Sequence, residues 1–287
     1  MKTLAFTLLL AILGCAPVDG FQAELKEKHG ASYLALTEAV AHHQSEQIRF
    51  FATGDSDKPI LLFIHGTPGS KDAFIDYLLD EQLQQQFHVI AIDRPGWGAA
   101  SDRTKPNSLE YQASILDEWV NSLRQPSQPL IVVGHSLGAS LAYVWATTHG
   151  DSVDGLVMLS GALDAERAKP RWYNRMVNNS LARWLLPHDL NKSNHEIYLL
   201  AQSLSAANKV DIKTKAIALL QGDEDFLVYP AHADFAKANW PNAHIKRLKD
   251  GGHFTPWQNK EEVLGLIQKV VDQLKLARDT NSVETGG

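Results

Sequence analysis

Ser136 stands in the sequence Gly134-His135-Ser136-Leu137-Gly138, between an apolar run of strand length and a segment with helical periodicity. A serine at a tight strand-to-helix turn is typical of a covalent nucleophile, and glycines on both sides let the strand and the helix pass close together. The start of a helix also supplies free backbone N–H groups beside a developing oxyanion. We therefore predict that Ser136 attacks a carbonyl carbon in an acyl-transfer reaction.

A nucleophilic serine needs a base, because its hydroxyl reacts poorly at neutral pH unless an imidazole accepts its proton. The chain has 12 histidines, and most of them fall in predicted helices or early segments. His253 differs because it follows Gly251 and Gly252, after a strand-like segment at 244–248. A glycine-rich loop there can present the imidazole across the top of a sheet. We predict His253 as the general base.

The third member of such a triad is a carboxylate that fixes the tautomer of the imidazole. Three acids, Asp223, Glu224 and Asp225, follow a strand-like run. The spacing from Gly222 to Asp225 lets the chain turn before it presents the acid, whereas the other two suit capping or solvation of the turn. The pattern favours Asp225, with Asp164 after the preceding strand as a substitute.

The oxyanion of an acyl-transfer intermediate needs two hydrogen-bond donors. The backbone N–H of Leu137 is one candidate, because it follows the nucleophile. The second is the N–H of Thr67, in the sequence His65-Gly66-Thr67-Pro68-Gly69 after the first long apolar run. For His65 and His135 themselves we predict structural roles.

The elements that would position these residues alternate along the chain. Apolar runs of strand length occur at 60–64, 89–92, 130–133, 156–159 and 216–220, and helices are expected near 73–86, 108–123, 137–148, 231–238 and 261–276. Continuous apolar runs indicate strands that are covered on both faces. The sequence therefore predicts an α/β fold with a mostly parallel central sheet flanked by helices. Residues 21–47 are expected to be helical or tether-like, with a break at Gly30.

The segment 161–210 interrupts this alternation and is predicted to be a small helical lid. It carries Trp172 and Trp184 and more basic than acidic residues, in a chain whose net charge is −6. One interpretation is that this segment receives an acyl chain or lies against anionic lipid headgroups. The alternative is a solvated helical face whose tryptophans pack on the core. Trp97, Trp172 and Trp184 are our candidates for substrate contacts.

Five motifs occur in the order of the α/β-hydrolase fold superfamily, which the chain resembles from about residue 48 to 276. They are His65 to Gly69, Asp93-Arg94-Pro95-Gly96-Trp97-Gly98, Gly134 to Gly138, Gly222-x-x-Asp225 and Gly252-His253-Phe254. The resemblance implies a serine hydrolase that cleaves a carboxylic ester through an acyl-enzyme, with neither a metal nor an organic cofactor. Its substrate would be a small-molecule or lipid ester.

Departures from family patterns exclude some activities. Epoxide hydrolases and haloalkane dehalogenases of this fold use an aspartate where this chain has Ser136. Proline iminopeptidases resemble His-Gly-Gly-Pro-Gly at the first loop and have Trp after the nucleophile, whereas Thr67 and Leu137 stand here. This difference weakens a peptidase activity but does not exclude it. Lactones, amides, lipid acyl groups and carbon–carbon bonds stay open as substrates. A surface lipoprotein that keeps the scaffold only for binding is the alternative from another class.

The N-terminus predicts export. Lys2 precedes an apolar run at 4–13, which is too short to span a bilayer. Ile12-Leu13-Gly14-Cys15 resembles the bacterial lipobox, so we expect a signal peptide at 1–14 and a lipid anchor on Cys15. That anchor would tether the chain to a membrane, facing the periplasm or exterior, and Ala16 favours the outer membrane. An ordinary signal peptide and a secreted soluble protein are the alternative.

The predicted organisation is a tether or helical segment at 15–47, a catalytic domain at 48–278 with the lid at 161–210, and a tail at 279–287. The chain has 287 residues, 44% of them hydrophobic, with 27 basic and 33 acidic side chains. No basic surface for nucleic acid is expected from this balance. A single cysteine excludes an intramolecular disulfide and a cysteine-rich zinc site. The oligomeric state is left open.

Overall fold

An eight-stranded, mostly parallel sheet forms the centre of the molecule in the computed structural model, which describes residues 18–44, 46–98 and 107–284. The strand order is β1-β2-β4-β3-β5-β6-β7-β8. The strands are β1 (Ala39–His43), β2 (Glu46–Thr53), β3 (Ile60–Ile64), β4 (His88–Ile92), β5 (Leu130–His135), β6 (Gly155–Leu159), β7 (Ala216–Gly222) and β8 (His244–Leu248). All neighbouring pairs from β4 to β8 are parallel, and β2 is antiparallel to both β1 and β4. The predicted fold class is confirmed.

Every apolar run that was predicted as a strand forms one. Strands β3, β5, β6 and β7 are buried along their whole length, as their continuous apolar sequences predict. The region before them was predicted less well. Helix α2 (Val18–Ala35) is interrupted at Gly30, where φ is 51°, as the predicted break requires. Beyond it the chain forms β1 and the start of β2 instead of a tether. Strand β1 alternates between exposed and half-buried positions, and β2 mixes buried, half-buried and exposed ones, so the hairpin lacks a continuous buried run. The domain boundary predicted at residue 48 falls inside β2.

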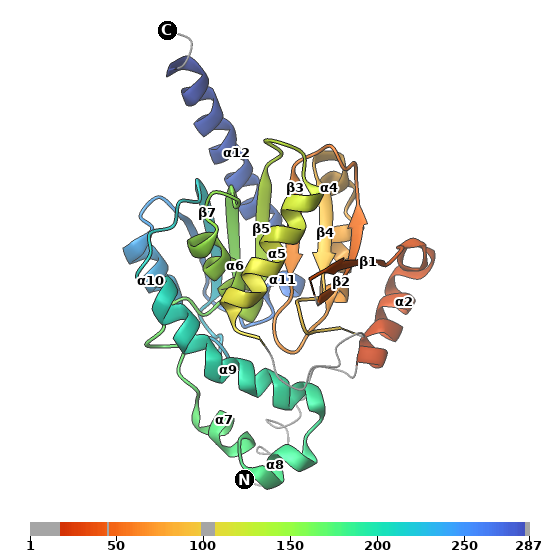
Figure 1. Cartoon of the computed structure of the whole chain (residues 1–287), viewed down its shortest axis with the longest axis vertical. Helices are drawn as coiled ribbons and strands as arrows, with labels where there is room; N and C mark the ends of the chain where they lie inside the picture. The colour runs from red at the N-terminus through yellow and green to blue at the C-terminus, as the bar shows by residue number, and fades with distance from the viewer. Residues whose placement is uncertain (1–17, 45, 99–106, 285–287) are drawn as a thin grey trace.

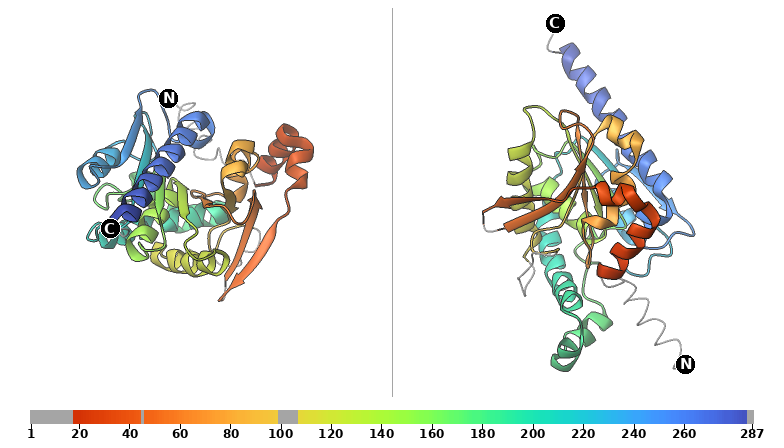
Figure 2. Two further views of the ribbon diagram at one scale, coloured as in Figure 1. Left: turned by 90° about the horizontal axis from the view of Figure 1, so that it is seen from above. Right: turned by 90° about the vertical axis from the view of Figure 1, so that its right-hand side faces the viewer.

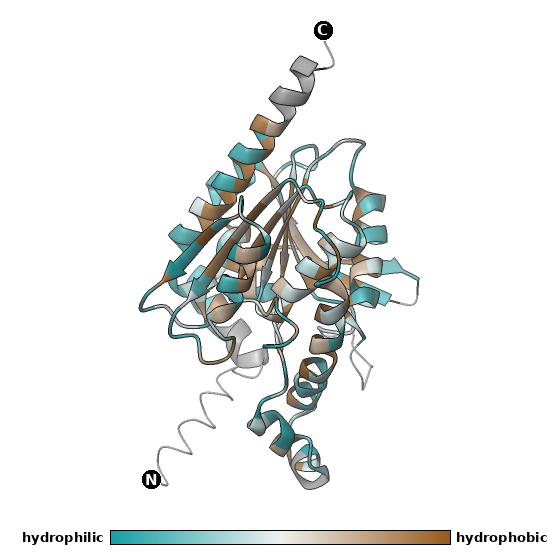
Figure 3. Cartoon of the chain, turned by 90° about the vertical axis from the view of Figure 1, so that its left-hand side faces the viewer, coloured by the Kyte–Doolittle hydropathy of each residue, from teal (hydrophilic) through white to brown (hydrophobic). Residues whose placement is uncertain are grey.

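Helices cover both faces of the sheet (Figures 1 and 2). One core cluster joins the sheet to α5 (Leu109–Leu123), α6 (Leu137–Thr148) and α10 (Ala231–Asn239). The other joins it to α2 and to η1 (Lys71–Phe74), α3 (Ile75–Leu78), α4 (Glu81–Gln86) and α12 (Lys260–Glu284), which follows the short α11 (Thr255–Gln258). Figure 3 shows the hydrophobic strands between these layers.

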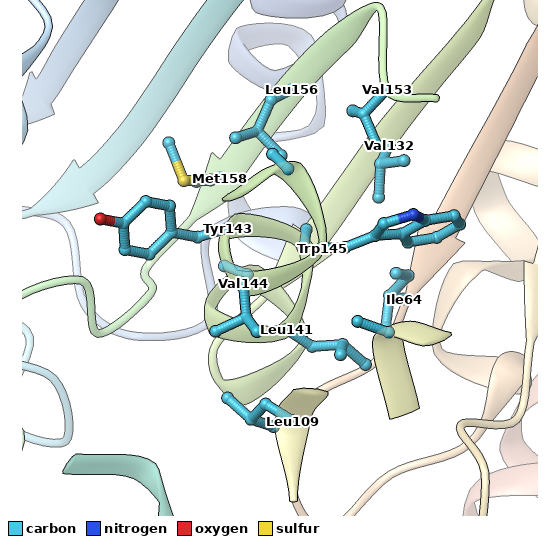
Figure 4. Packing of buried hydrophobic residues seen from close by; sticks show 14 of the residues in the cluster. Ile64, Leu109, Val132, Leu141, Tyr143, Val144, Trp145, Val153, Leu156 and Met158 are labelled. Atoms are coloured by element: carbon cyan, nitrogen blue, oxygen red, sulfur yellow. The ribbon is translucent and has the colours of Figure 1, made fainter. Parts of the chain in front are cut away.

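Helix α6 lies at the centre of the first core cluster. Figure 4 shows its side chains Leu141, Val144 and Trp145 among residues of the sheet such as Val132 and Leu156, and all five are buried. Burial of large apolar side chains on this scale stabilises a fold by about 1.5–3 kcal/mol for each side chain. The packing therefore holds the N-terminus of α6, and Ser136 before it, in a fixed place.

The helix predicted at 73–86 is instead three short pieces, η1, α3 and α4. The break lies at Asp80, which has an extended backbone and accepts a hydrogen bond from the N–H of Leu83 at 3.1 Å as the N-cap of α4. A side-chain acceptor at this position favours a new helix start over a continuous helix.

The 161–210 insertion between β6 and β7 contains α7 (Trp172–Val177), α8 (Ser180–Leu185) and α9 (His188–Ala207). Helix α9 packs against α6. Helices α7 and α8 lie beyond α9, on its side away from the sheet (Figure 1). The insertion is therefore helical, as predicted, and α9 packs on the body of the protein while α7 and α8 lie on its outer side.

Candidate active site

Ser136 occupies a strained turn between β5 and α6. Its backbone angles are φ 54° and ψ −121°, in a region that residues other than glycine rarely adopt. A Cβ atom on Gly134 would lie 2.3 Å from the carbonyl oxygen of Gly138, and one on Gly138 would lie 2.3 Å from that of Ile64. Close backbone contacts therefore require glycine at both positions. The sequence predicted this requirement, because the strand and the helix pass close together at the turn.

His253 and Asp225 form a buried hydrogen bond, with 2.8 Å between Nδ1 of His253 and Oδ2 of Asp225. The Asp225 carboxylate also accepts bonds from the N–H groups of Leu227 at 2.9 Å and Val228 at 2.8 Å, and from the side-chain amide of Gln221 at 3.2 Å. Four donors hold this carboxylate in one orientation. When Nδ1–H of the neutral His253 ring donates to Asp225, the Nε2 atom of the same ring is the nitrogen that can accept a proton.

The sheet brings the predicted residues to one edge. Ser136 directly follows β5, Asp225 follows β7 by three residues and His253 follows β8 by five. Because these strands are parallel, their carboxyl ends meet at the same edge. His135 also links two of the loops, since its Nε2 lies 3.0 Å from the carbonyl oxygen of His253. The fold therefore places serine, histidine and carboxylate on neighbouring loops.

The loop at 65–69 holds Thr67, the predicted oxyanion donor, and we therefore call it the oxyanion loop; it passes directly beside Ser136. A Cβ atom on Gly66 would lie 3.0 Å from the Cβ of Ser136, a tight contact that glycine avoids. Thr67 follows Gly66 at this point. Leu137 is the first residue of α6, and its N–H has no carbonyl of the same helix to bond. The two predicted donors thus lie on the two backbone segments that adjoin Ser136.

Two further histidines at the site have structural surroundings, as predicted. The Nε2 of His65 accepts the N–H of Arg94 at 3.0 Å, and its Nδ1 lies 2.8 Å from the carbonyl oxygen of Gly66. Burial, and then the positive charge of Arg94, lower the pKa of His65 well below its usual range. Burial likewise lowers the pKa of His135 to about 3. Both imidazoles are therefore neutral at physiological pH.

We expect the stability of the protein to fall steeply when the pH drops from 7 to 5. Burial lowers the pKa of His232 to about 4, as it lowers those of His65 and His135. In the unfolded chain each imidazole binds a proton near pH 6.5, so unfolding takes up protons below that pH and becomes more favourable. Each group contributes about 1.4 kcal/mol per pH unit until the folded pKa is reached.

Urea denaturation at pH 7, 6 and 5 measures this loss, which should reach about 6 kcal/mol in total for the three groups. His135→Gln should make the dependence on pH shallower by about one proton, while His188→Gln, on a half-exposed side chain, should leave it unchanged. A free energy of unfolding that is the same at pH 7 and pH 5 would contradict the expectation.

A buried ion pair that the sequence did not reveal lies next to the oxyanion loop. Both nitrogens of the Arg94 fork bond the Glu196 carboxylate, at 2.8 and 2.9 Å, and both side chains are almost completely buried. Burial raises the pKa of Glu196, but the Arg94 charge and its hydrogen bonds outweigh this effect and hold the pKa below its usual range. Arg94 belongs to the motif from Asp93 to Gly98, whereas no sequence pattern marks Glu196, which lies in α9.

The three candidate tryptophans have different surroundings. Trp97 is buried, its indole N–H donates to Glu196 at 3.0 Å, and the cationic groups of Arg94 and Lys192 lie over its ring. It therefore belongs to the buried polar cluster of Arg94 and Glu196. Trp172 on α7 and Trp184 on α8 are 67% and 80% exposed. The interpretation in which these two tryptophans pack on the core is wrong.

Metal-binding residues do not cluster in the described part of the chain: no group of three or more His, Cys, Asp or Glu side chains there could hold an ion. Within the same residues, no helix is both long and apolar enough to cross a membrane. The predicted signal peptide at 1–14 and the lipidation site at Cys15 lie outside the described residues.

Known proteins that resemble this chain in sequence include enzymes that act on lipids. A 1-acylglycerol-3-phosphate O-acyltransferase of Arabidopsis thaliana is 33% identical over 124 residues, which cover 41% of this chain and 29% of the relative. A monoacylglycerol lipase of Homo sapiens is 25% identical over 131 residues, covering 45% of this chain and 38% of the relative. The match thus spans only about a third of each relative's length.

Solved structures of the same fold cover nearly the whole chain. A bacterial membrane phospholipase A superposes with a TM-score of 0.67 over 96% of this chain and 99% of its own, at 19% identity. A putative lipase of Acinetobacter baumannii AYE superposes with a TM-score of 0.63 over 90% and 97%, at 22% identity. The model of the α/β hydrolase fold family matches residues 59–206, more than half of the chain. The protein therefore belongs to the α/β-hydrolase fold family.

Proposed function

We propose that the protein is a serine hydrolase that cleaves a carboxylic ester through an acyl-enzyme intermediate. The observation that carries the proposal is the buried hydrogen bond of 2.8 Å between His253 and Asp225, on the sheet edge where Ser136 occupies its strained turn. An aspartate that orients an imidazole beside a serine is the arrangement that activates a hydroxyl for attack. Enzymes named for lipid ester chemistry among the relatives agree with it.

The mechanism uses the residues of the site in two half-reactions. The Oγ of Ser136 attacks the ester carbonyl carbon while Nε2 of His253 takes its proton, and Asp225 stabilises the imidazolium that forms. The N–H groups of Leu137 and Thr67 bind the oxyanion of the tetrahedral intermediate. His253 then protonates the leaving alcohol, and a water molecule, activated in the same way, releases the acid. This chemistry requires no cofactor.

Hydrolysis of p-nitrophenyl esters of graded acyl length, together with fluorophosphonate labelling, tests the proposal. We expect turnover with an optimum in chain length, which would give the size of the acyl site, and labelling of one serine. Labelling without turnover on these esters would shift the proposal to an amide, lactone or other acyl substrate on the same residues. Absence of both would favour the alternative of a binding protein on a hydrolase scaffold.

A lipid ester is the substrate class that the 161–210 insertion favours. Trp172, Met176, Trp184 and Leu185 on α7 and α8 are each more than 60% exposed. Large exposed apolar side chains that cluster on outer helices are typical of surfaces that contact a membrane or an aggregated substrate. Two arginines, Arg175 on α7 and Arg183 on α8, lie on the same helices and suit anionic headgroups.

A polar cavity of about 350 Å³ adjoins this surface. Its lining residues are Asn178, Arg183, Asn191, Asn194, His195 and Tyr198. Arg183 in this cavity directly precedes the exposed Trp184. An arginine, with donors from asparagine and histidine around it, can bind a phosphate group while the neighbouring tryptophan enters the apolar layer.

We expect faster turnover on micellar than on monomeric esters of one acyl length. Trp172→Ser combined with Trp184→Ser should reduce the micellar rate by at least about 100-fold, because the two indoles together contribute about 3–6 kcal/mol when they leave water. The monomeric rate should not change. Leu123→Ser, at the end of α5 and 47% exposed, is the matched control and should change neither rate. Equal rates on both forms of substrate would refute the lipid-surface proposal.

Attachment to a membrane through Cys15 completes the proposal. Export by the segment 1–14 and lipidation of Cys15 would hold the catalytic domain at a bilayer, facing the periplasm or exterior, where lipid esters are present. Secretion as a soluble protein is the alternative. Metabolic labelling with a fatty acid analogue, with Cys15→Ser as the control, distinguishes the two.

A further inference from the structure

We propose that Glu196, on α9 of the 161–210 insertion, is a positioning residue for the oxyanion loop. Its carboxylate, paired with Arg94, holds Thr67 where its backbone N–H meets the oxyanion. This assignment rests on the proposed ester hydrolysis. It makes one helix of the insertion part of the machinery that stabilises the transition state.

Arg94 connects the oxyanion loop to the rest of the site. Its guanidinium donates to the carbonyl oxygen of Gly66 at 3.1 Å and to the side chain of Gln112 at 2.9 Å. Its backbone N–H bonds the His65 ring at 3.0 Å. Two successive residues of the oxyanion loop, directly before Thr67, are therefore held by one arginine.

Glu196 fixes the position of the Arg94 guanidinium. The two side chains are 0% and 2% exposed, and they form a two-pronged pair at 2.8 and 2.9 Å. The indole N–H of Trp97 is a further donor to the same carboxylate. Two buried charges are stable only when their geometry satisfies both groups, so the pair admits little displacement. Residues 102 positions apart in the sequence are thus held in one arrangement.

Helix α9 also contacts Thr67 directly. The Thr67 hydroxyl donates to Oγ of Ser193 at 3.0 Å, and it lies within hydrogen-bonding reach of the Glu196 carboxylate. Ser193 in turn donates to the carbonyl oxygen of Asp189 at 2.8 Å. The side chain of Thr67 therefore points to α9, and its backbone lies in the segment beside Ser136. A shift of α9 would move the backbone N–H of Thr67.

This geometry predicts which kinetic constant depends on Glu196. The oxyanion exists only in the tetrahedral intermediate and the transition states around it, so a misplaced Thr67 N–H weakens binding of the transition state and not of the ester. Complete loss of one such donor costs about 10²- to 10³-fold in kcat. Displacement of a donor that is still present should cost about tenfold.

Glu196→Gln and Thr67→Val test the proposal in the full-length protein, singly and combined, with a p-nitrophenyl ester. We expect each variant to lower kcat by about tenfold with KM unchanged within about twofold. Because both act on the position of the same N–H, the double variant should lose little more than either single one. Thr67→Ser keeps the hydroxyl and should restore kcat. Affinity for an alkyl boronic acid, which forms a tetrahedral adduct, should fall together with kcat.

Asp151→Asn, between α6 and β6 and 87% exposed, also removes one carboxylate charge; it is the matched control and should leave kcat and KM unchanged. Unchanged kcat in Glu196→Gln, a rise in KM alone, or losses that multiply in the double variant would overturn the proposal. If Glu196→Gln does not fold, as judged by its melting temperature, Thr67→Val and Thr67→Ser decide the question. A wild-type protein that neither hydrolyses esters nor labels with fluorophosphonate would instead refute the hydrolase function itself.

Discussion

Ser136→Ala is expected to lower kcat for ester hydrolysis by about 10⁴-fold or more, with KM little changed. The alanine has no hydroxyl to form the acyl-enzyme, so only the oxyanion donors and substrate binding still accelerate attack by water. The turn before α6 should tolerate the change, because Cβ is retained and only one atom is lost. Stopped-flow or steady-state release of p-nitrophenol measures the effect, together with fluorophosphonate labelling, which should disappear.

Ser114→Ala, on α5, is the matched control for this result, and it should retain both turnover and labelling. Equal melting temperatures of wild type and Ser136→Ala would show that the loss is chemical. Persistent labelling of the Ser136→Ala variant would mean that another serine is the nucleophile, and it would remove the basis of the proposed mechanism.

Asp225→Asn is expected to lower kcat by about 10⁴-fold. The asparagine side chain brings an N–H₂ group into a position that now accepts bonds from His253, Gln221, Leu227 and Val228. The side-chain oxygen of the asparagine can still accept bonds from the N–H groups of Leu227 and Val228. Its NH₂ group then faces Nδ1 of His253, so it favours the tautomer of His253 with the proton on Nε2. That tautomer cannot accept the proton of Ser136. The measurement is kcat on the same ester at neutral pH.

Asp223→Asn tests whether a neighbouring acid, and not Asp225, is the carboxylate of the triad. Asp223 is partly exposed and pairs with Arg247 at 2.6 Å, away from the imidazole, so we expect nearly wild-type kcat. Asp164, the substitute candidate, bonds the N–H of Glu166 and the side chain of Arg167. Loss of activity in Asp223→Asn or Asp164→Asn, with activity kept in Asp225→Asn, would show that the acid is misassigned.

The exposed side chains of the insertion illustrate where sequence reasoning was insufficient. The sequence predicts a helical segment around Trp172 and Trp184 but leaves open whether their rings pack inward. A tryptophan contributes the same apolar surface in either case, and only the direction of α7 and α8 relative to the body decides its exposure. The structure puts these helices on the outer side of α9 (Figure 1), and the two rings face solvent.

The sequence by itself determined the features that depend on a few consecutive residues. The buried strands were predictable because a continuous apolar run is stable only when both of its faces are covered. The turn at Ser136 was predictable because close passage of strand and helix requires Gly134 and Gly138. The positions of Asp225 and His253 after their strands followed from the order of the elements, and parallel strands bring such loops to one edge.

Tertiary structure alone decided the features that join distant parts of the chain. The pairing of β1 with β2 rests on an edge hairpin of alternating burial, which has no strong local pattern. The ion pair of Arg94 and Glu196 joins positions 102 residues apart, and a glutamate on a polar helix looks solvated until packing buries it. Local sequence determines which element forms, whereas the partner of a buried charge is determined only when the elements pack together.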